Sequence, residues 1–178
     1  MTTLKFDPDF ARVLLPSKAK ETTPPVTSLD GSSTITVTRF LPESVARNVI
    51  AHDAEVSQTQ FFAVEYRVAP EHPFPAAVED VFATVVWLQG SAAQFGVDPA
   101  RIILTGLSAG GGVAAGAALI ARDKGLDPPV AAQVLRYAML DDRTAIDESS
   151  PLSPYLTWTV AQNDMGWKTY LGEREVSS

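Results

Sequence analysis

The stretch from Gly106 to Gly110, Gly-Leu-Ser-Ala-Gly, constrains the fold of this chain more than any other. A run typical of a β-strand, residues 101–105, precedes it, and a run rich in glycine and alanine, residues 111–122, follows it. Strand, sharp turn and helix in this order are typical of a nucleophile elbow, in which a serine hydroxyl stands above the end of a sheet. The pattern predicts Ser108 at that turn, with Gly106 and Gly110 avoiding clashes that a Cβ would cause.

The predicted chemistry at Ser108 is nucleophilic. A serine at a helix N-terminus lies beside unpaired backbone N–H groups, which stabilise the negative charge that develops during acyl transfer. Two rival glycine-loop motifs do not fit. A dinucleotide fingerprint requires glycine at position 108, and a phosphate-binding loop requires Gly-Lys-Ser or Gly-Lys-Thr, which is absent here.

The composition indicates a single globular domain, with room for a small appendage. Of the 178 residues, 46% are hydrophobic and 20% charged, as in ordinary folded proteins. The formal net charge is −7 without a Lys/Arg cluster, which disfavours a nucleic acid or an anionic membrane as partner. Since cysteine is absent and the histidines are only His52 and His72, we expect no disulfide, no metal site and no cofactor.

The sequence also gives an expectation about the compartment. Residues 1–6 contain no apolar signal core, and the longest apolar runs are too short to cross a bilayer. The lack of cysteine fits a reducing compartment. We therefore expect a soluble, cytoplasmic chain.

Hydrophobic periodicity predicts an α/β fold, with a mostly parallel sheet and flanking helices. Alternating or apolar runs predict strands over residues 34–40, 61–66 and 130–140, and a helix is expected over residues 43–56. Pro75 is expected at the first position of the next helix. The predicted buried stripe of that helix is Val78, Val81, Phe82, Val85 and Leu88.

Three segments are expected along the chain. Residues 1–25 are predicted to form an N-terminal helical arm with a linker, residues 26–148 the α/β core, and residues 149–178 a lid-like helical segment. The last segment carries an aromatic face, which would be exposed if the helix stood alone. It is expected to pack either over the site or against another copy in a homo-oligomer. That face consists of Trp158, Met165, Trp167 and Tyr170.

The two histidines are interpreted as structural. His72 lies in residues 67–75, a loop that three prolines stiffen, and a loop-locking hydrogen bond is favoured over a general-base role. His52 has solvent-type neighbours and is interpreted as a surface or capping residue.

Four segments carry a resemblance to a known family: Tyr-Arg-Val-Ala-Pro-Glu-His-Pro-Phe-Pro-Ala-Ala at residues 66–77, Asp-Pro-Ala-Arg-Ile at 98–102, the elbow at 106–111, and Leu-Asp-Asp-Arg at 140–143. Together they resemble the hormone-sensitive-lipase-like branch of the α/β-hydrolases, which are carboxylesterases and lipases. The resemblance implies that Ser108 attacks a small-molecule ester, with the backbone N–H of Ala109 as one oxyanion donor and no cofactor.

The chain departs from that family pattern in two places. The family's His-Gly-Gly-Gly loop, which supplies further oxyanion donors, is absent, since the sequence between Pro42 and Val45 runs from a strand end directly into a helix. No histidine follows Ser108, so Asp141 or Asp142 would have no partner as a triad acid. The resemblance thus implies a shortened chain with an internal deletion, lacking the central strand before the oxyanion loop and the C-terminal strands.

Two functions follow from these departures. The first is a serine ester hydrolase by family with little or no activity of its own. The second is a non-catalytic relative that binds a small acyl ligand or a protein partner. Amide, thioester and lactone bonds remain alternatives to an ester, because they share the same acyl-transfer machinery.

Overall fold

The computed structural model describes residues 20–41, 57–143, 149–151 and 153–172. By its internal contacts the chain divides into two compact units, residues 1–25 with 36–65 and residues 26–35 with 66–178. Several predictions lie outside the described residues: the amphipathic helix near the N-terminus, the helix over residues 43–56 with His52, and the deletion between Pro42 and Val45.

The first unit contains antiparallel strands. The central strand β3 (Thr34–Phe40) pairs on one side with β1 (Lys20–Thr22) and on the other with β4 (Phe61–Glu65), so that Val37 lies opposite Val64. Ile35 and Val37 are each 1% exposed, while the residues between and before them face solvent. The strand predicted over residues 34–40 is therefore confirmed, and the period-two alternation holds over residues 34–37, whereas Thr38 and Phe40 are buried as well. Strand β1 lies in a stretch where a linker was expected.

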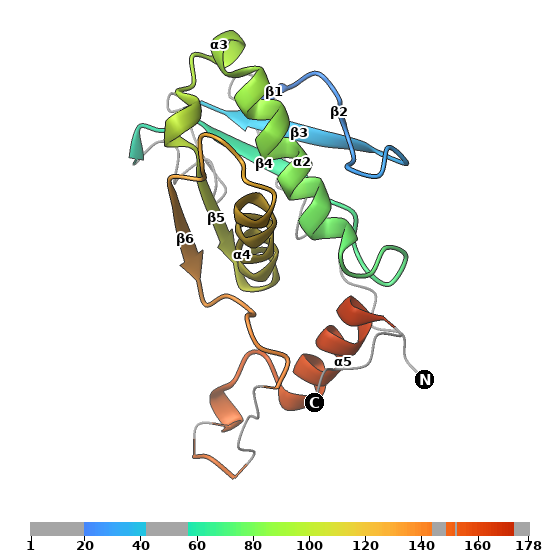
Figure 1. Ribbon diagram of the computed structural model, residues 1–178. Coiled ribbons are helices and arrows are strands. Elements are labelled where there is room, and N and C mark those ends of the chain that lie inside the picture. The colour runs from blue at the N-terminus through green and yellow to red at the C-terminus, as the bar shows by residue number, and fades with distance from the viewer. Residues whose placement is uncertain (1–19, 42–56, 144–148, 152, 173–178) are drawn as a thin grey trace. The chain divides into compact units, whose positions relative to one another are not determined.

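The second unit contains a parallel pair of strands, β5 (Ile103–Leu107) and β6 (Ala132–Arg136). Helix α4 (Ser108–Asp123) connects them and lies along both, as Figure 1 shows. This arrangement confirms an α/β fold with parallel strands and flanking helices. Strand β6 is shorter than the predicted run 130–140, and beyond its end the backbone N–H of Met139 bonds to the carbonyl of Ser108.

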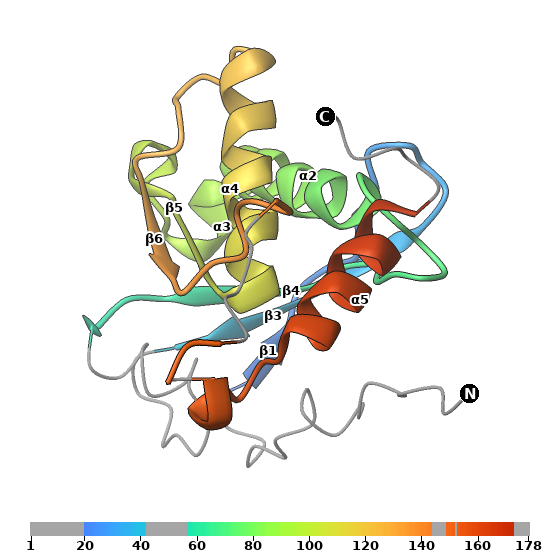
Figure 2. The ribbon, with the colours of Figure 1, turned by 90° about the horizontal axis from the view of Figure 1, so that it is seen from below.

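Helix α2 (Ala76–Gly90) packs against α4, and Figures 1 and 2 both show the two helices side by side. Its predicted apolar stripe is confirmed, since all five residues are buried. Pro75 precedes the helix, at φ −99° and ψ 12°, and is not its first residue as predicted. A short helix, α3 (Ala92–Phe95), and a 3-10 turn, η2 (Pro99–Arg101), lead from α2 into β5.

The remaining elements of the second unit come before or after these strands and helices in the sequence. Strand β2 (Val26–Thr27) pairs with the start of β3 through a tight turn in which Gly31 has φ 71°. A 3-10 turn, η3 (Ser153–Tyr155), precedes helix α5 (Val160–Leu171). Among the described helices, none combines the length and the apolar character that crossing a bilayer would need.

Candidate active site

The turn between β5 and α4 presents Ser108. Leu107 ends the strand in an extended conformation, and Ser108 begins the helix with φ 50°, in the left-handed region. That region disfavours residues with a Cβ and costs on the order of 1–3 kcal/mol, so it persists only where the surrounding structure enforces it. Here the Met139 N–H holds the Ser108 carbonyl at 3.1 Å. The sequence prediction of a sharp strand-to-helix turn at this serine agrees with the geometry.

Close backbone approach explains the glycines around the serine. A Cβ on Gly106 would lie 2.5 Å from the carbonyl carbon of Gly110 and 2.7 Å from the nitrogen of Gly111. A Cβ on Gly111 would lie 2.6 Å from the Ala138 Cβ. The steric role expected of Gly110 is different: a Cβ there would meet only the Tyr66 hydroxyl, at an ordinary 3.8 Å. The further tight positions are therefore Gly111 and Gly112, where a Cβ would meet the Met139 carbonyl oxygen. The spacing of the motif singled out neither.

The serine hydroxyl is accessible. Ser108 and Ala109 are both exposed, and within the part of the chain that the structure describes the Ser108 Oγ makes no hydrogen bond. The first N–H groups of α4 have no partner within the helix. The role of the Ala109 N–H as an oxyanion donor stays a prediction.

Tyr66, the residue directly after β4, stands beside this turn. Its hydroxyl lies at the first turn of α4, next to Gly110. Burial raises its pKa. Burial also raises the pKa of Tyr170, to about 12, and the proximity of Tyr66 adds to that rise. The two phenols therefore lie close together and both stay protonated through the neutral range.

Helix α5 packs against the same region. The Phe74 N–H donates to the Tyr170 carbonyl at 2.7 Å, and the two rings meet edge to face at 5.8 Å. One turn earlier on α5, a Cβ on Gly166 would lie 3.9 Å from the Met139 Cε. Met139 is also the residue whose N–H bonds to Ser108. The aromatic face of α5 thus has contacts within this chain, and its action as a lid stays a prediction.

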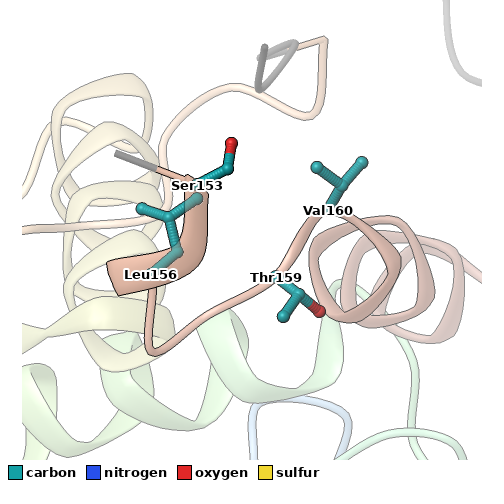
Figure 3. Close-up of a pocket in the computed structure, with 4 residues that line it drawn as sticks. All are labelled: Ser153, Leu156, Thr159 and Val160. Carbon is teal, nitrogen blue, oxygen red and sulfur yellow. The ribbon is translucent and has the colours of Figure 1, made fainter. Parts of the chain in front are cut away.

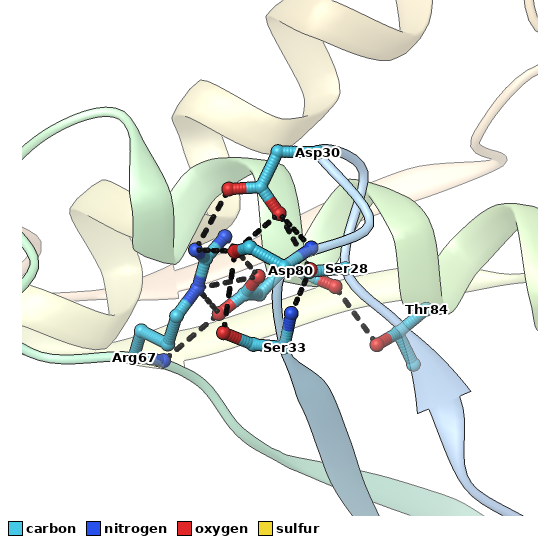
Figure 4. A network of polar contacts seen from close by, with 7 residues as sticks. Ser28, Asp30, Ser33, Arg67, Asp80 and Thr84 are labelled. Atoms are coloured by element: carbon cyan, nitrogen blue, oxygen red, sulfur yellow. Dashed lines mark hydrogen bonds and ion pairs between the residues drawn. The ribbon is translucent and has the colours of Figure 1, made fainter.

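An ion-pair network, shown in Figure 4, fixes the loop over residues 67–75. The Arg67 guanidinium reaches the Asp80 carboxylate at 2.8 Å and Asp30 at 3.0 Å, and the Arg67 backbone N–H donates to Asp80 at 2.9 Å. Asp80 is fully buried. Hydrogen bonds from Ser28, from the Ser32 backbone and from Arg67 hold the pKa of Asp30 well below its usual value.

No role for Asp80 was predicted from the sequence. The sequence nevertheless contained a signal for the role of Asp80. Asp80 lies one turn from Ala77 and Thr84, both buried on α2, and a carboxylate on a buried face requires a cationic partner. The nearest preceding cation in the chain is Arg67.

The other titratable candidates do not form a catalytic group with Ser108. His72 is exposed, and it contributes to its loop through its backbone, whose N–H donates to the Val68 carbonyl at 3.0 Å. Asp141 accepts hydrogen bonds from the Arg143 side chain at 2.9 Å and from its backbone at 3.0 Å, and these lower the pKa of Asp141. That carboxylate is thus engaged by an arginine.

A small cavity of about 210 Å³ lies between η3 and the start of α5 (Figure 3). Ser153, Leu156, Thr159 and Val160 line it. None of the predicted site residues belongs to its lining, so this cavity is separate from the elbow.

Comparison with known proteins identifies the family. A family model described as the alpha/beta hydrolase fold matches residues 40–178. The chain belongs to the α/β-hydrolase family. Its resemblance to the hormone-sensitive-lipase-like branch is confirmed by its relatives. Carboxylesterase NlhH of Mycobacterium tuberculosis is 46% identical over 81 residues, which are 46% of this chain and 25% of NlhH.

Two further relatives of this α/β-hydrolase extend the comparison. The solved structure of a bacterial heroin esterase matches with a TM-score of 0.73 and 30% identity, over 90% of this chain and 58% of that protein. The gibberellin receptor GID1 of Oryza sativa subsp. japonica is 31% identical over 121 residues, which are 67% of this chain and 34% of the receptor. The chain therefore spans less than two thirds of the length of each relative.

Proposed function

We propose that this α/β-hydrolase acts on small-molecule carboxylic esters through an acyl-enzyme at Ser108. The observation that carries the proposal is the turn itself, where an exposed serine is held at φ 50° at the end of β5. A strained non-glycine residue at a strand-to-helix turn is favoured where its side chain has a chemical role. The names of two relatives, a carboxylesterase and a heroin esterase, support an ester as the bond that is cleaved.

In the proposed reaction the Ser108 Oγ bonds to the ester carbonyl carbon, while the carbonyl π electrons move to oxygen and the hydroxyl proton leaves to water. The Ala109 N–H donates to that oxygen. The tetrahedral intermediate then releases the alcohol, which takes up a proton, and leaves an acyl group on Ser108. Attack by water releases the acid and restores the hydroxyl.

We propose further that the 178-residue chain turns over slowly. No histidine follows Ser108 and no His-Gly-Gly-Gly loop is present in its sequence. Loss of the general base costs roughly 10⁴–10⁶ in rate, and each missing oxyanion donor costs about 10²–10³. Slow formation of a covalent adduct at the serine is therefore expected to be detectable where hydrolytic turnover is not.

The test uses the purified chain and its Ser108→Ala variant. An alkyl fluorophosphonate should add slowly and selectively to Ser108, as a mass increase on the peptide that contains it, whereas p-nitrophenyl butyrate should be hydrolysed at the rate of the buffer control. Failure of the probe to modify Ser108 would contradict the nucleophile assignment. Ester turnover that disappears in Ser108→Ala would contradict the proposed low activity.

A non-catalytic binding function is the second candidate. It is supported by the missing base and by the relation to a protein named as a gibberellin receptor, which aligns over 67% of this chain. In this case a small acyl ligand or a protein partner would occupy the region above Ser108. Equal ligand affinity of the wild type and Ser108→Ala, without any fluorophosphonate adduct, would favour it.

The segment boundaries are part of the proposal. The proposed segments are an N-terminal helical arm at residues 1–25, the incomplete core at residues 26–148 and a lid-like helical segment at residues 149–178. The net charge of −7 supports small molecules over nucleic acids as partners. A homo-oligomer is the alternative role for the α5 face.

A further inference from the structure

The Tyr66 hydroxyl is the side-chain donor that the structure brings to the first turn of α4. It lies 3.8 Å from the position that a Cβ on Gly110 would occupy, and Gly110 follows Ser108 by two residues. Tyr66 makes no hydrogen bond with any residue that the structure describes. Its donor therefore remains available to a molecule bound beside the serine.

The backbone next to Tyr66 is held in place. The Arg67 N–H donates to Asp80 at 2.9 Å, and the Arg67 side chain makes three further bonds to the same buried carboxylate. Rotation of the chain at this point would break the contacts that, among the described residues, compensate the buried Asp80 charge. The Tyr66 side chain therefore extends from a backbone that is held in place. A group that stabilises developing charge in a transition state must be fixed in this way.

A second tyrosine, Tyr170, lies near this phenol. Tyr170 lies close enough to interact electrostatically with Tyr66, and α5 carries Tyr170 against Phe74. Both tyrosines are half-buried, and burial raises the pKa of each, so both remain neutral donors at pH 7.

We propose that the Tyr66 hydroxyl donates a hydrogen bond to the carbonyl oxygen of an ester bound at Ser108. The inference rests on the proposed function. When the Ser108 Oγ bonds to the carbonyl carbon, the displaced π electrons collect on the oxygen, and Tyr66 shares that charge with the backbone donor at Ala109. No proton leaves the phenol. In a chain that lacks a glycine loop, one side chain supplies part of the missing donor set.

The experiment compares the rate at which an alkyl fluorophosphonate modifies Ser108 in the wild type, in Tyr66→Phe and in Tyr155→Phe. In this reaction the Oγ–P bond forms, the P–F bond breaks, fluoride leaves, and the serine proton goes to solvent. The phosphonyl oxygen collects charge as an ester oxygen does. Tyr66→Phe should react about a hundredfold more slowly, which is the lower end of what a single oxyanion donor supplies. Tyr155, which is 81% exposed, is the matched control and should react at the wild-type rate.

A second experiment keeps the aromatic ring of residue 66 and therefore the fold. Fluorotyrosine at position 66 ionises at lower pH than tyrosine, and a phenolate cannot donate, so its modification rate should fall with rising pH where the wild-type rate does not. Equal rates in the wild type and Tyr66→Phe, or a fluorotyrosine profile that follows the wild type, overturn this inference and leave the nucleophile assignment standing. An unmodified wild-type Ser108 overturns both.

Discussion

At Gly106 a hydrogen is the only side chain that fits, because the backbone of Gly110 and Gly111 occupies the space of a Cβ. At Gly110 the space is open as far as the Tyr66 hydroxyl. Glycines of the same motif thus differ in what they do for the fold. The first permits the sharp turn, whereas the second leaves room beside the serine.

This difference predicts opposite outcomes for two alanine variants. Gly106→Ala should lower the free energy of unfolding by about 2–4 kcal/mol, since the backbone of the turn must shift. Gly110→Ala should leave it unchanged or raise it by up to about 1 kcal/mol, because alanine favours a helix. Urea unfolding followed by tryptophan fluorescence measures both. Equal losses in the two variants would contradict the geometry.

Among the elements, α5 has the best-defined beginning. The Thr159 hydroxyl accepts from the Gln162 N–H at 3.3 Å, and the Gln162 side chain accepts from the Thr159 N–H at 2.8 Å. This capping box satisfies donors that the first turn of the helix cannot. The other end is fixed by the bond from Phe74 to Tyr170.

Thr159→Ala should therefore destabilise α5 by about 1 kcal/mol. Hydrogen exchange of the α5 amides should accelerate about fivefold, while the amides of α4 should keep their rates. Thr157→Ala, two residues earlier and outside the capping box, serves as the control. An unchanged exchange rate in α5 of Thr159→Ala would show that packing alone holds the helix.

For the whole molecule, the buried phenols make stability depend on alkaline pH. Tyrosine in an unfolded chain titrates near pH 10, whereas the pKa of Tyr170 is raised to about 12. The folded state keeps the Tyr170 proton to higher pH, so the stability that is complete below pH 10 falls as the pH rises toward 12. Tyr170→Phe should show a shallower fall. Urea unfolding between pH 8 and pH 12 tests this, and parallel curves for the two proteins would contradict it.

The spacing of apolar residues along the sequence predicted the elements whose burial is set within one strand or one helix. The alternation in β3 and the apolar stripe of α2 follow from periodicity, and the elbow follows from a strand, two glycines and a helix. The residue pairs that connect different elements were not predicted from the sequence. The burial of Asp80 depends on Arg67, thirteen residues away, and Met139, beyond the end of β6, bonds to Ser108 at the start of α4. Single-residue patterns do not encode such pairings.

The Arg67 network also has a consequence for the order in which the chain assembles during synthesis. Asp30 leaves the ribosome 37 residues before Arg67, with Asp80 later still. Its carboxylate is already oriented by its own turn, through the Ser28 hydroxyl at 2.6 Å and the Ser32 N–H at 3.0 Å. The hairpin that is synthesised first therefore holds the Asp30 carboxylate in a fixed orientation, and the Arg67 guanidinium, synthesised later, can bind to it.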